Sequence, residues 1–243
     1  ASDVYKRQEY DEPDFQKYPN ISRVGHSVDQ QLLYIAERLF IDDSEVQRNP
    51  KQNLGGWVSG GDIKYKNLPD VNGNYDNVID SNDRQYTGMP TTPEIVYGFG
   101  PSFRYKKFDF SFFFQGAARV SIMMNGIHPF GAEGTRNVLQ FIADDYWSET
   151  NQNIYAEYPR LSKRDNENNT KASTYWQRNG AFLKLKNLEV GFNHKFFRVY
   201  LRGSNLLTFS PFKYWDPEMG SGSGLSYPTQ RVFNVGVQFS INK

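Results

Sequence analysis

The chain has 243 residues, enough to bury a sizeable core, and its 28 Lys and Arg nearly balance its 27 Asp and Glu, for a net charge of +1. This balance provides no electrostatic basis for binding nucleic acid, so none is expected as a partner. The sequence contains no cysteine, which excludes a disulfide scaffold.

Aromatic residues make up 16% of the chain, with 19 Phe and 16 Tyr. Soluble domains rarely need so many, whereas outer-membrane β-barrels place aromatic side chains in girdles at both membrane interfaces. No run of 18 apolar residues is present, so no transmembrane helix is predicted, and the mean hydropathy is −0.70. A barrel whose strands alternate apolar and polar residues also has a low mean hydropathy.

The chain begins with ASDVYKRQ, which lacks the apolar core of a signal peptide. We interpret residues 1–8 as a sequence artefact and leave them out of the fold prediction. Because a barrel protein needs a signal to reach its membrane, we expect the natural chain to begin further upstream.

An Asn- and Asp-rich segment spans residues 72–83. Counted from its first residue, side-chain oxygens fall at positions 1, 3, 5, 9 and 12 and a backbone carbonyl at position 7, the ligand spacing of a Ca²⁺ loop. Asn77 stands where a sharp turn is needed, and asparagine tolerates the left-handed conformation better than most residues. The alternative is a loop with local turn hydrogen bonds. The candidate Ca²⁺ ligands are Asn72, Asn74, Asp76, Val78, Asp80 and Asp83.

Strict alternation of apolar and polar residues begins at Glu94. From there to Lys106 the aromatic residues occupy odd positions, and from residue 108 to 115 phenylalanine occupies every even position. Because successive side chains of a strand point to opposite faces, this pattern predicts two amphipathic strands. The change of phase places a tight turn at Lys106–Lys107.

The same alternation returns at residues 197–202 and 233–240. Between Ala181 and Asn193 the apolar residues change parity at Lys186–Asn187, as a β-bulge would require. A short turn is expected near residues 194–195.

Long and short connections alternate along the chain. The alternation lapses at roughly 37–93, 120–179 and 208–229, whereas the turns near 106 and 194 are short. Outer-membrane barrels have this order, with short periplasmic turns and long extracellular loops. Charged residues also lie opposite the Phe and Val rows, and a lipid-facing Lys or Arg at the bilayer midplane costs about 2–4 kcal/mol. The predicted fold class is all-β, the C-terminal strands of a large antiparallel transmembrane β-barrel with long extracellular loops.

Several short motifs are distributed over most of the chain in a fixed order. They are GDIKYK at 61–66, VID at 78–80, TGMP at 87–90, STYW at 173–176, FLKLKNL at 182–188, NL at 205–206 and DPE at 216–218. In this order they resemble the SusC/RagA-type TonB-linked transporters of the bacterial outer membrane. The final alternation, Val235-x-Val237-x-Phe239, also resembles the C-terminal signal that barrel-assembly machinery reads.

The resemblance implies a fragment of a larger barrel, with the plug domain and TonB box absent from this chain. It implies TonB as a partner through that missing N-terminal part, a SusD-like lipoprotein over the outer loops, and contact with outer-membrane lipid. The implied substrate is an oligosaccharide or a peptide. We accordingly expect barrel strands and a long extracellular loop with the Asp/Asn-rich segment in residues 9–93, and C-terminal barrel hairpins and loops in residues 94–243.

Aromatic side chains in the predicted outer loops are candidates for contact with substrate. Stacking on sugars or on peptide side chains fits a nutrient importer, and anchoring of the barrel rim is the alternative. The candidates are Trp147, Trp176, Tyr214 and Trp215. Trp147 lies in an acidic segment far from any predicted strand, and is the first choice for contact with a ligand or partner.

No catalytic constellation is evident. Carboxylate pairs such as Asp144/Asp145 and Asp216/Glu218 could suggest a glycosidase, but such pairs are common in solvated loops. The three histidines have no metal-ligand spacing, and no Ser/His/Asp set is visible. We therefore predict transport and no catalysis. The alternative is a secreted β-sandwich that binds glycans.

Overall fold

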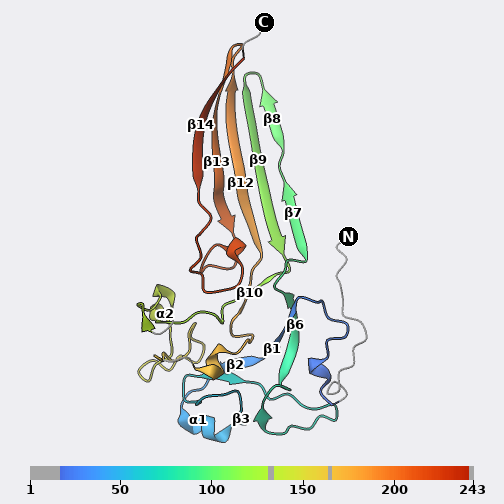
Figure 1. Ribbon diagram of the computed structural model, residues 1–243, viewed down its shortest axis with the longest axis vertical. Helices are drawn as coiled ribbons and strands as arrows, with labels where there is room; N and C mark the ends of the chain where they lie inside the picture. The colour runs from blue at the N-terminus through green and yellow to red at the C-terminus, as the bar shows by residue number, and fades with distance from the viewer. Residues whose placement is uncertain (1–16, 131–133, 164–165, 241–243) are drawn as a thin grey trace.

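The structure, a computed structural model, describes residues 17–130, 134–163 and 166–240. The predicted artefact at residues 1–8 lies outside these ranges. One end of the molecule is a long antiparallel β-sheet, and the other end is a lobe of short strands, helices and loops (Figure 1). None of the described helices is long and apolar enough to cross a membrane.

The sheet has six strands in the order β14-β13-β12-β9-β7, with β8 also paired to β9. All of its pairings are antiparallel, and the predicted all-β fold class is confirmed. The short turns predicted near 106 and 194 are also confirmed, because the strands on either side of each turn are neighbours (Figure 1). The strands are β7 (Ile95–Phe99), β8 (Ser102–Tyr105), β9 (Phe108–Ala118), β12 (Phe182–Asn193), β13 (Phe197–Phe209) and β14 (Val232–Phe239).

Proline divides the first predicted strand into β7 and β8 without changing its register. Phe99 lies opposite Phe114, and Ser102 lies opposite Ser111, so two residues lie between these pairs on both strands and the register is unchanged. Pro101 has no N–H to donate to the ladder, which interrupts it at that residue. Among the described residues this strand is at the edge of the sheet, where proline is tolerated.

The predicted β-bulge in β12 is confirmed. Between Leu185 and Asn187 the register shifts against both β9 and β13, and Lys186 is the extra residue opposite β9. In β13, Asn205 adopts the left-handed conformation, with φ 55°, near the same level of the sheet. The bulge lets Leu183 and Leu188 reach the same face although their parity differs.

The two faces of the sheet differ completely in chemistry. The register places the aromatic and aliphatic rows of β9, β12, β13 and β14 on one side, here called the apolar face. It comprises Phe108, Phe110, Phe112, Phe114, Leu188, Val190, Phe192, Val199, Leu201, Phe233, Val235, Val237 and Phe239. This set contains no charged residue, so the predicted separation of charges from the apolar rows is confirmed.

The opposite side, here called the polar face, carries a ladder of ion pairs across three strands. Arg198 of β13 contacts Asp109 of β9 at 2.5 Å and Glu189 of β12 at 2.6 Å. Arg202 contacts the same Glu189 at 2.5 Å. Tyr200 lies between the two arginines, within 6 Å of both guanidinium groups (5.0 and 5.8 Å to the ring centroid). Each charge has an opposite partner, which offsets the loss of solvation.

Residues 17–94 and 119–181 form the loop lobe, which contains short two-stranded pairings. Every strand described between residues 17 and 93 lies in this lobe, whereas barrel strands were predicted within 9–93; residues 9–16 lie outside the described ranges. The strands are β1 (Gln30–Tyr34) with β6 (Arg84–Pro90), β2 (Ala36–Leu39) with β4 (Ile63–Tyr65), β3 (Lys51–Gln52) with β5 (Val78–Ile79), and β10 (Ser121–Met123) with β11 (Gln177–Asn179). The helices are η1 (Pro19–Ile21), α1 (Asp43–Arg48), α2 (Gln140–Asp144), α3 (Glu167–Thr170) and, in the connection from β13 to β14, η3 (Pro217–Met219).

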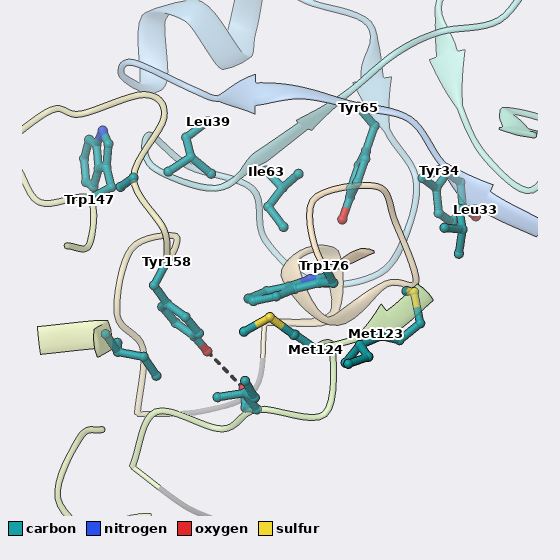
Figure 2. Packing of buried hydrophobic residues seen from close by; sticks show 14 of the residues in the cluster. Leu33, Tyr34, Leu39, Ile63, Tyr65, Met123, Met124, Trp147, Tyr158 and Trp176 are labelled. Atoms are coloured by element: carbon teal, nitrogen blue, oxygen red, sulfur yellow. Dashed lines mark hydrogen bonds between the residues drawn. The ribbon is translucent and has the colours of Figure 1, made fainter. Parts of the chain in front are cut away.

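The hydrophobic core lies in the loop lobe and not within the sheet. Its side chains come from segments more than 100 residues apart, and Leu39, Ile63 and Trp176 pack together there (Figure 2). The long connections therefore fold into an ordered body because they bury apolar surface of their own. Within the described ranges the sheet has no such cover on its apolar face, where Val235 is 76% exposed.

Candidate functional sites in the loop lobe

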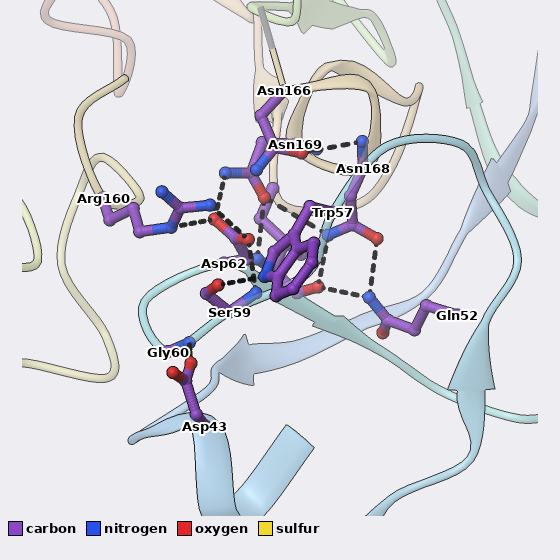
Figure 3. A network of polar contacts seen from close by, with 11 residues as sticks. Asp43, Gln52, Trp57, Ser59, Gly60, Asp62, Arg160, Asn166, Asn168 and Asn169 are labelled. Carbon is purple, nitrogen blue, oxygen red and sulfur yellow. Dashed lines mark hydrogen bonds and ion pairs between the residues drawn. The ribbon is translucent and has the colours of Figure 1, made fainter. Parts of the chain in front are cut away.

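The GDIKYK segment supplies a buried carboxylate at the centre of the loop lobe. Asp62 is fully buried, and its carboxylate pairs with the guanidinium group of Arg160. Two contacts join them, Nε to Oδ1 at 2.9 Å and Nη2 to Oδ2 at 3.0 Å. Asn169 of α3 also donates to Oδ1 at 2.9 Å, and the backbone N–H of Ser59 donates to Oδ2 at 2.8 Å (Figure 3). A buried carboxylate is tolerated only when paired and hydrogen-bonded in this way. Asp62 therefore joins three segments of the lobe.

Two amides continue this network beneath β4. Gln52 donates to the carbonyl of Ile63 at 2.9 Å and to the side chain of Asn168 at 2.6 Å. It also accepts from the N–H of Tyr65 at 2.6 Å, so the amide replaces a missing strand partner along β4. The Tyr65 hydroxyl donates to the Asn168 carbonyl at 2.7 Å, and burial raises the pKa of Tyr65 above its usual value. These contacts are structural and leave no group free for chemistry.

Gly61 has no side chain because the indole of Trp147 occupies that space. Its φ is +79°, and a Cβ there would lie 2.2 Å from the Trp147 ring. Both the backbone conformation and the close approach therefore require glycine. This explains the glycine of the motif in physical terms.

A polar hollow of about 500 Å³ lies beside this network, between α1 and the segment after Trp147. Arg160 is already paired with Asp62, and Asp43 accepts from the N–H of Gly60 at 2.8 Å. The hollow could admit a polar ligand. Its lining residues are Asp42, Asp43, Ser59, Gly60, Trp147, Glu149, Gln152 and Arg160.

Two of the four aromatic residues predicted to contact substrate lie in the core. Trp147 is 6% exposed and Trp176 is 3% exposed, and the Trp176 indole donates to the carbonyl of Asn169 at 2.6 Å. Both side chains pack in the hydrophobic core and are largely withdrawn from solvent, and their contact with substrate stays a prediction. Tyr214 and Trp215 are half-buried against the same cluster, and their contact with substrate stays a prediction.

The aromatic side chains that reach solvent in the described lobe come from turns. Trp57 is 80% exposed, and Tyr155 and Tyr75 are also exposed. Trp57 follows Gly55 and Gly56 and donates from its indole to Ser59 at 2.8 Å, which fixes the ring. The flanking glycine pair and the lack of an apolar pattern around it were the sequence signals for exposure.

The predicted Ca²⁺ segment forms two successive turns. The left-handed conformation predicted at Asn77 is confirmed, with φ 58°. The first turn is closed by Asp70, which accepts from the N–H groups of Asn72 and Asn74 at 2.8 and 2.9 Å. In the described residues no three acidic or histidine side chains are placed to hold a metal ion. The Ca²⁺ site therefore stays a prediction.

The second turn contains the carboxylates predicted as the later ligands. Asp76 accepts from the N–H of Val78 at 3.0 Å, and Asp83 accepts from the N–H of Asp80 at 2.8 Å and from Leu68 at 2.7 Å. Burial, and then the charges of Asp76 and Asp80, raise the pKa of Asp83. The ligand spacing in the sequence remains the basis of the Ca²⁺ prediction, because these carboxylates do not converge on one centre in the described residues.

Comparisons with known proteins bear on the whole chain. No family model matches it. TonB-dependent receptor P3 of Formosa agariphila is 30% identical over 191 residues, which cover 69% of this chain and 18% of that protein. TonB-dependent receptor P26 of the same organism is 29% identical over 246 positions, covering 86% of this chain and 24% of that protein.

Solved structures show the same fold. The RagAB peptide importer in its open-open state superimposes with a TM-score of 0.63 at 19% identity, covering 96% of this chain and 24% of that chain. The closed-closed state gives a TM-score of 0.58 at 21% identity, covering 95% and 24%. The resemblance to SusC/RagA-type TonB-dependent receptors is confirmed. The chain spans between about a fifth and a quarter of the length of these relatives.

In this SusC/RagA-type segment, one ionic cluster makes the lobe sensitive to acid. Burial alone would favour the neutral form of Glu45, but hydrogen bonds from Arg38, the N–H of Ile41 and Lys64 outweigh it and lower its pKa to about 2. Arg38 contacts Glu45 at 2.5 Å and Lys64 contacts it at 3.1 Å. A carboxyl group whose pKa is lower in the folded state stabilises the fold at pH values above its unfolded-state pKa. This stabilisation is lost as the pH falls through the folded-state pKa.

We predict that Glu45→Gln lowers the stability of the lobe at neutral pH and flattens its dependence on pH between about 4 and 2. Amide hydrogen exchange in α1 and β2 of the receptor, measured across that interval, would report the change. Asp29→Asn is the control, since Asp29 is exposed. An unchanged acid profile in Glu45→Gln would contradict the role given to this carboxylate.

The Ca²⁺ prediction is tested separately. If the second turn binds Ca²⁺, the ion slows hydrogen exchange at residues 76–83 and a chelator reverses the effect. Asp80→Asn should abolish the response, because it removes one candidate ligand. Equal rates of hydrogen exchange at residues 76–83 with Ca²⁺ and with chelator would contradict the Ca²⁺ site. The segment would then be a loop held by local turn hydrogen bonds.

Proposed function

We propose that the chain is the C-terminal barrel segment of a TonB-dependent importer in the bacterial outer membrane. The observation that carries the proposal is the sheet, which combines an apolar face without charges and a polar face with paired charges. A barrel wall needs this arrangement, since one face contacts lipid and the other a polar lumen. All of the long connections lie at one end of the sheet, as extracellular loops would (Figure 1).

The secreted β-sandwich is less well supported. A sandwich buries the apolar face of one sheet against a second sheet about 10 Å away. In the described residues no second sheet covers the apolar face, and side chains such as Phe233 and Val235 stand exposed. Lipid would cover this surface in an outer membrane.

The unpaired sheet edges support a place in a larger barrel. Within the described part of the chain, β14 and β7 each have one edge without a strand partner. Open edges are aggregation templates in water and leave backbone groups unsatisfied in lipid. We propose that strands from the rest of the receptor pair with both edges. Residues 9–93 would then contribute mainly extracellular structure, and residues 94–243 the hairpins of the wall.

The proposed cargo is an oligosaccharide or a peptide. The solved relative is a peptide importer, which favours peptide, while specificity would reside in loops and in parts outside this chain. TonB would supply energy through an N-terminal plug, and a SusD-like lipoprotein would cap the loop lobe. We propose no catalytic step, because the relatives are receptors and an importer.

Uptake in cells tests the proposal. Deletion of the gene that encodes the full receptor should abolish uptake of labelled oligopeptides or of labelled oligosaccharides, and the intact gene should restore it. An uncoupler of the inner membrane should also stop uptake, because TonB draws its energy there. Recovery of the receptor in the soluble fraction, or uptake unaffected by deletion for both cargo classes, would contradict the proposal.

A further inference from the structure

Two motifs from separate parts of the sequence meet at one buried ion cluster. Lys184 of β12 lies 2.6 Å from Asp216 and 2.5 Å from Glu218, which flank Pro217 in η3. Lys186 lies 2.5 Å from the other oxygen of Glu218. The FLKLKNL strand and the DPE loop are thus two halves of one contact, which the import function does not by itself explain.

Because Lys184 is buried, separating its ammonium group from the two carboxylates is energetically unfavourable. The Lys184 side chain is 1% exposed, so its ammonium group has almost no contact with water. A buried charge without a partner is very unfavourable, and removing one member of a buried pair is strongly destabilising. Two lysines face two carboxylates, so the cluster is neutral overall. The loop that carries Asp216 must therefore stay against β12 as long as Lys184 is charged.

The cluster lies on the polar face of the sheet. Lys184 is opposite Gln115 in β9 and Thr208 in β13, whereas Leu185 beside it belongs to the apolar side. The connection from Ser210 to Arg231, here called the last loop, therefore lies over the polar face. Figure 1 shows it between the sheet and the loop lobe.

The last loop is also attached to the loop lobe. The N–H of Met123 in β10 donates to the Ser221 hydroxyl at 3.0 Å, and the N–H of Gly222 donates back to the Met123 carbonyl at 3.1 Å. Tyr214 of the last loop also packs against Phe141 of α2 in the lobe, with ring centroids 4.9 Å apart. The ion cluster at Asp216 and Glu218 therefore lies between the aromatic contact of Tyr214 and the hydrogen bonds of Ser221 and Gly222.

We propose that Lys184 is a positioning residue that holds the last loop over the mouth of the lumen and couples the barrel wall to the loop lobe. The proposal rests on the proposed function in one respect, that the polar face lines a lumen. Loss of the Lys184 charge removes the ion-pair partner of Asp216 and leaves Glu218 with Lys186 alone, and the loop leaves the polar face to hydrate the two carboxylates. The neighbouring Lys213 is exposed and makes no such contact in the described structure.

Cysteine accessibility in the full receptor tests this inference. The chain has no cysteine, so Met219→Cys introduces a reporter beside Glu218, with any cysteine elsewhere in the receptor replaced. Its reaction rate with a water-soluble maleimide should rise at least about tenfold in Lys184→Met, which corresponds to about 1.4 kcal/mol. Lys213→Met, a matched change on the same loop, should leave the rate unchanged.

A second pair of variants keeps the test decisive. Asp216→Asn combined with Glu218→Gln removes the two carboxylate charges of the cluster on the loop side. This double variant should also raise the rate of maleimide labelling at Met219→Cys, and it provides the test if Lys184→Met fails to assemble. A reporter at Thr150→Cys in the loop lobe should not change in either variant. Unchanged rates at position 219, or equal increases at 219 and 150, would overturn the proposal. The rates do not depend on uptake, so a receptor that transports nothing but shows this loop release would contradict the proposed function alone.

Discussion

The structure depends on the two-residue alternation of side chains along its long strands. Alternation assigns each residue of β9, β12, β13 and β14 either to the apolar face or to the polar face. A slip of one residue would transfer an entire row of side chains to the other face. The bulge at Lys186 shows how strictly this assignment is kept, because it restores the apolar row after the parity changes. The consequence is a sheet with one apolar face that is unfavourable in water. Its opposite face carries charges and is unfavourable in lipid.

The loop lobe follows a different rule. It contains little regular structure, and its stability comes from a core of aromatic and aliphatic residues together with a network of buried polar groups. Asp62 and Arg160 join segments about 100 residues apart, and Gln52 completes the hydrogen bonds of β4. The long connections become a defined body in this way. The last loop joins this body to the sheet through Lys184.

Much of the sheet could be predicted from sequence because alternation is a local signal. The hairpin at Lys106, the bulge at Lys186 and the left-handed Asn77 each depend on a few neighbouring residues. Pro101 divides the first predicted strand into β7 and β8 but does not change its register against β9.

The lobe could not be predicted to the same extent, because its contacts join distant segments. Trp147 and Trp176 are candidates for substrate contact because they fall in the predicted outer loops, and the sequence does not show that packing against Gly61 and Asn169 buries them. The pairing of Lys184 with Asp216 spans 32 residues and has no periodic signature, although both motifs were visible.

The measurement that tests the central claim most directly is a cysteine scan of β14 in the full receptor, in its membrane. Single cysteines from Val232 to Phe239 would be labelled with a fluorophore and exposed to quenchers dissolved either in lipid or in water. Odd positions such as Val235 and Val237 should be quenched from lipid, and even positions such as Asn234 and Gln238 from water. Quenching from water at every position, or the absence of a two-residue period, would contradict a strand that forms part of a membrane barrel wall.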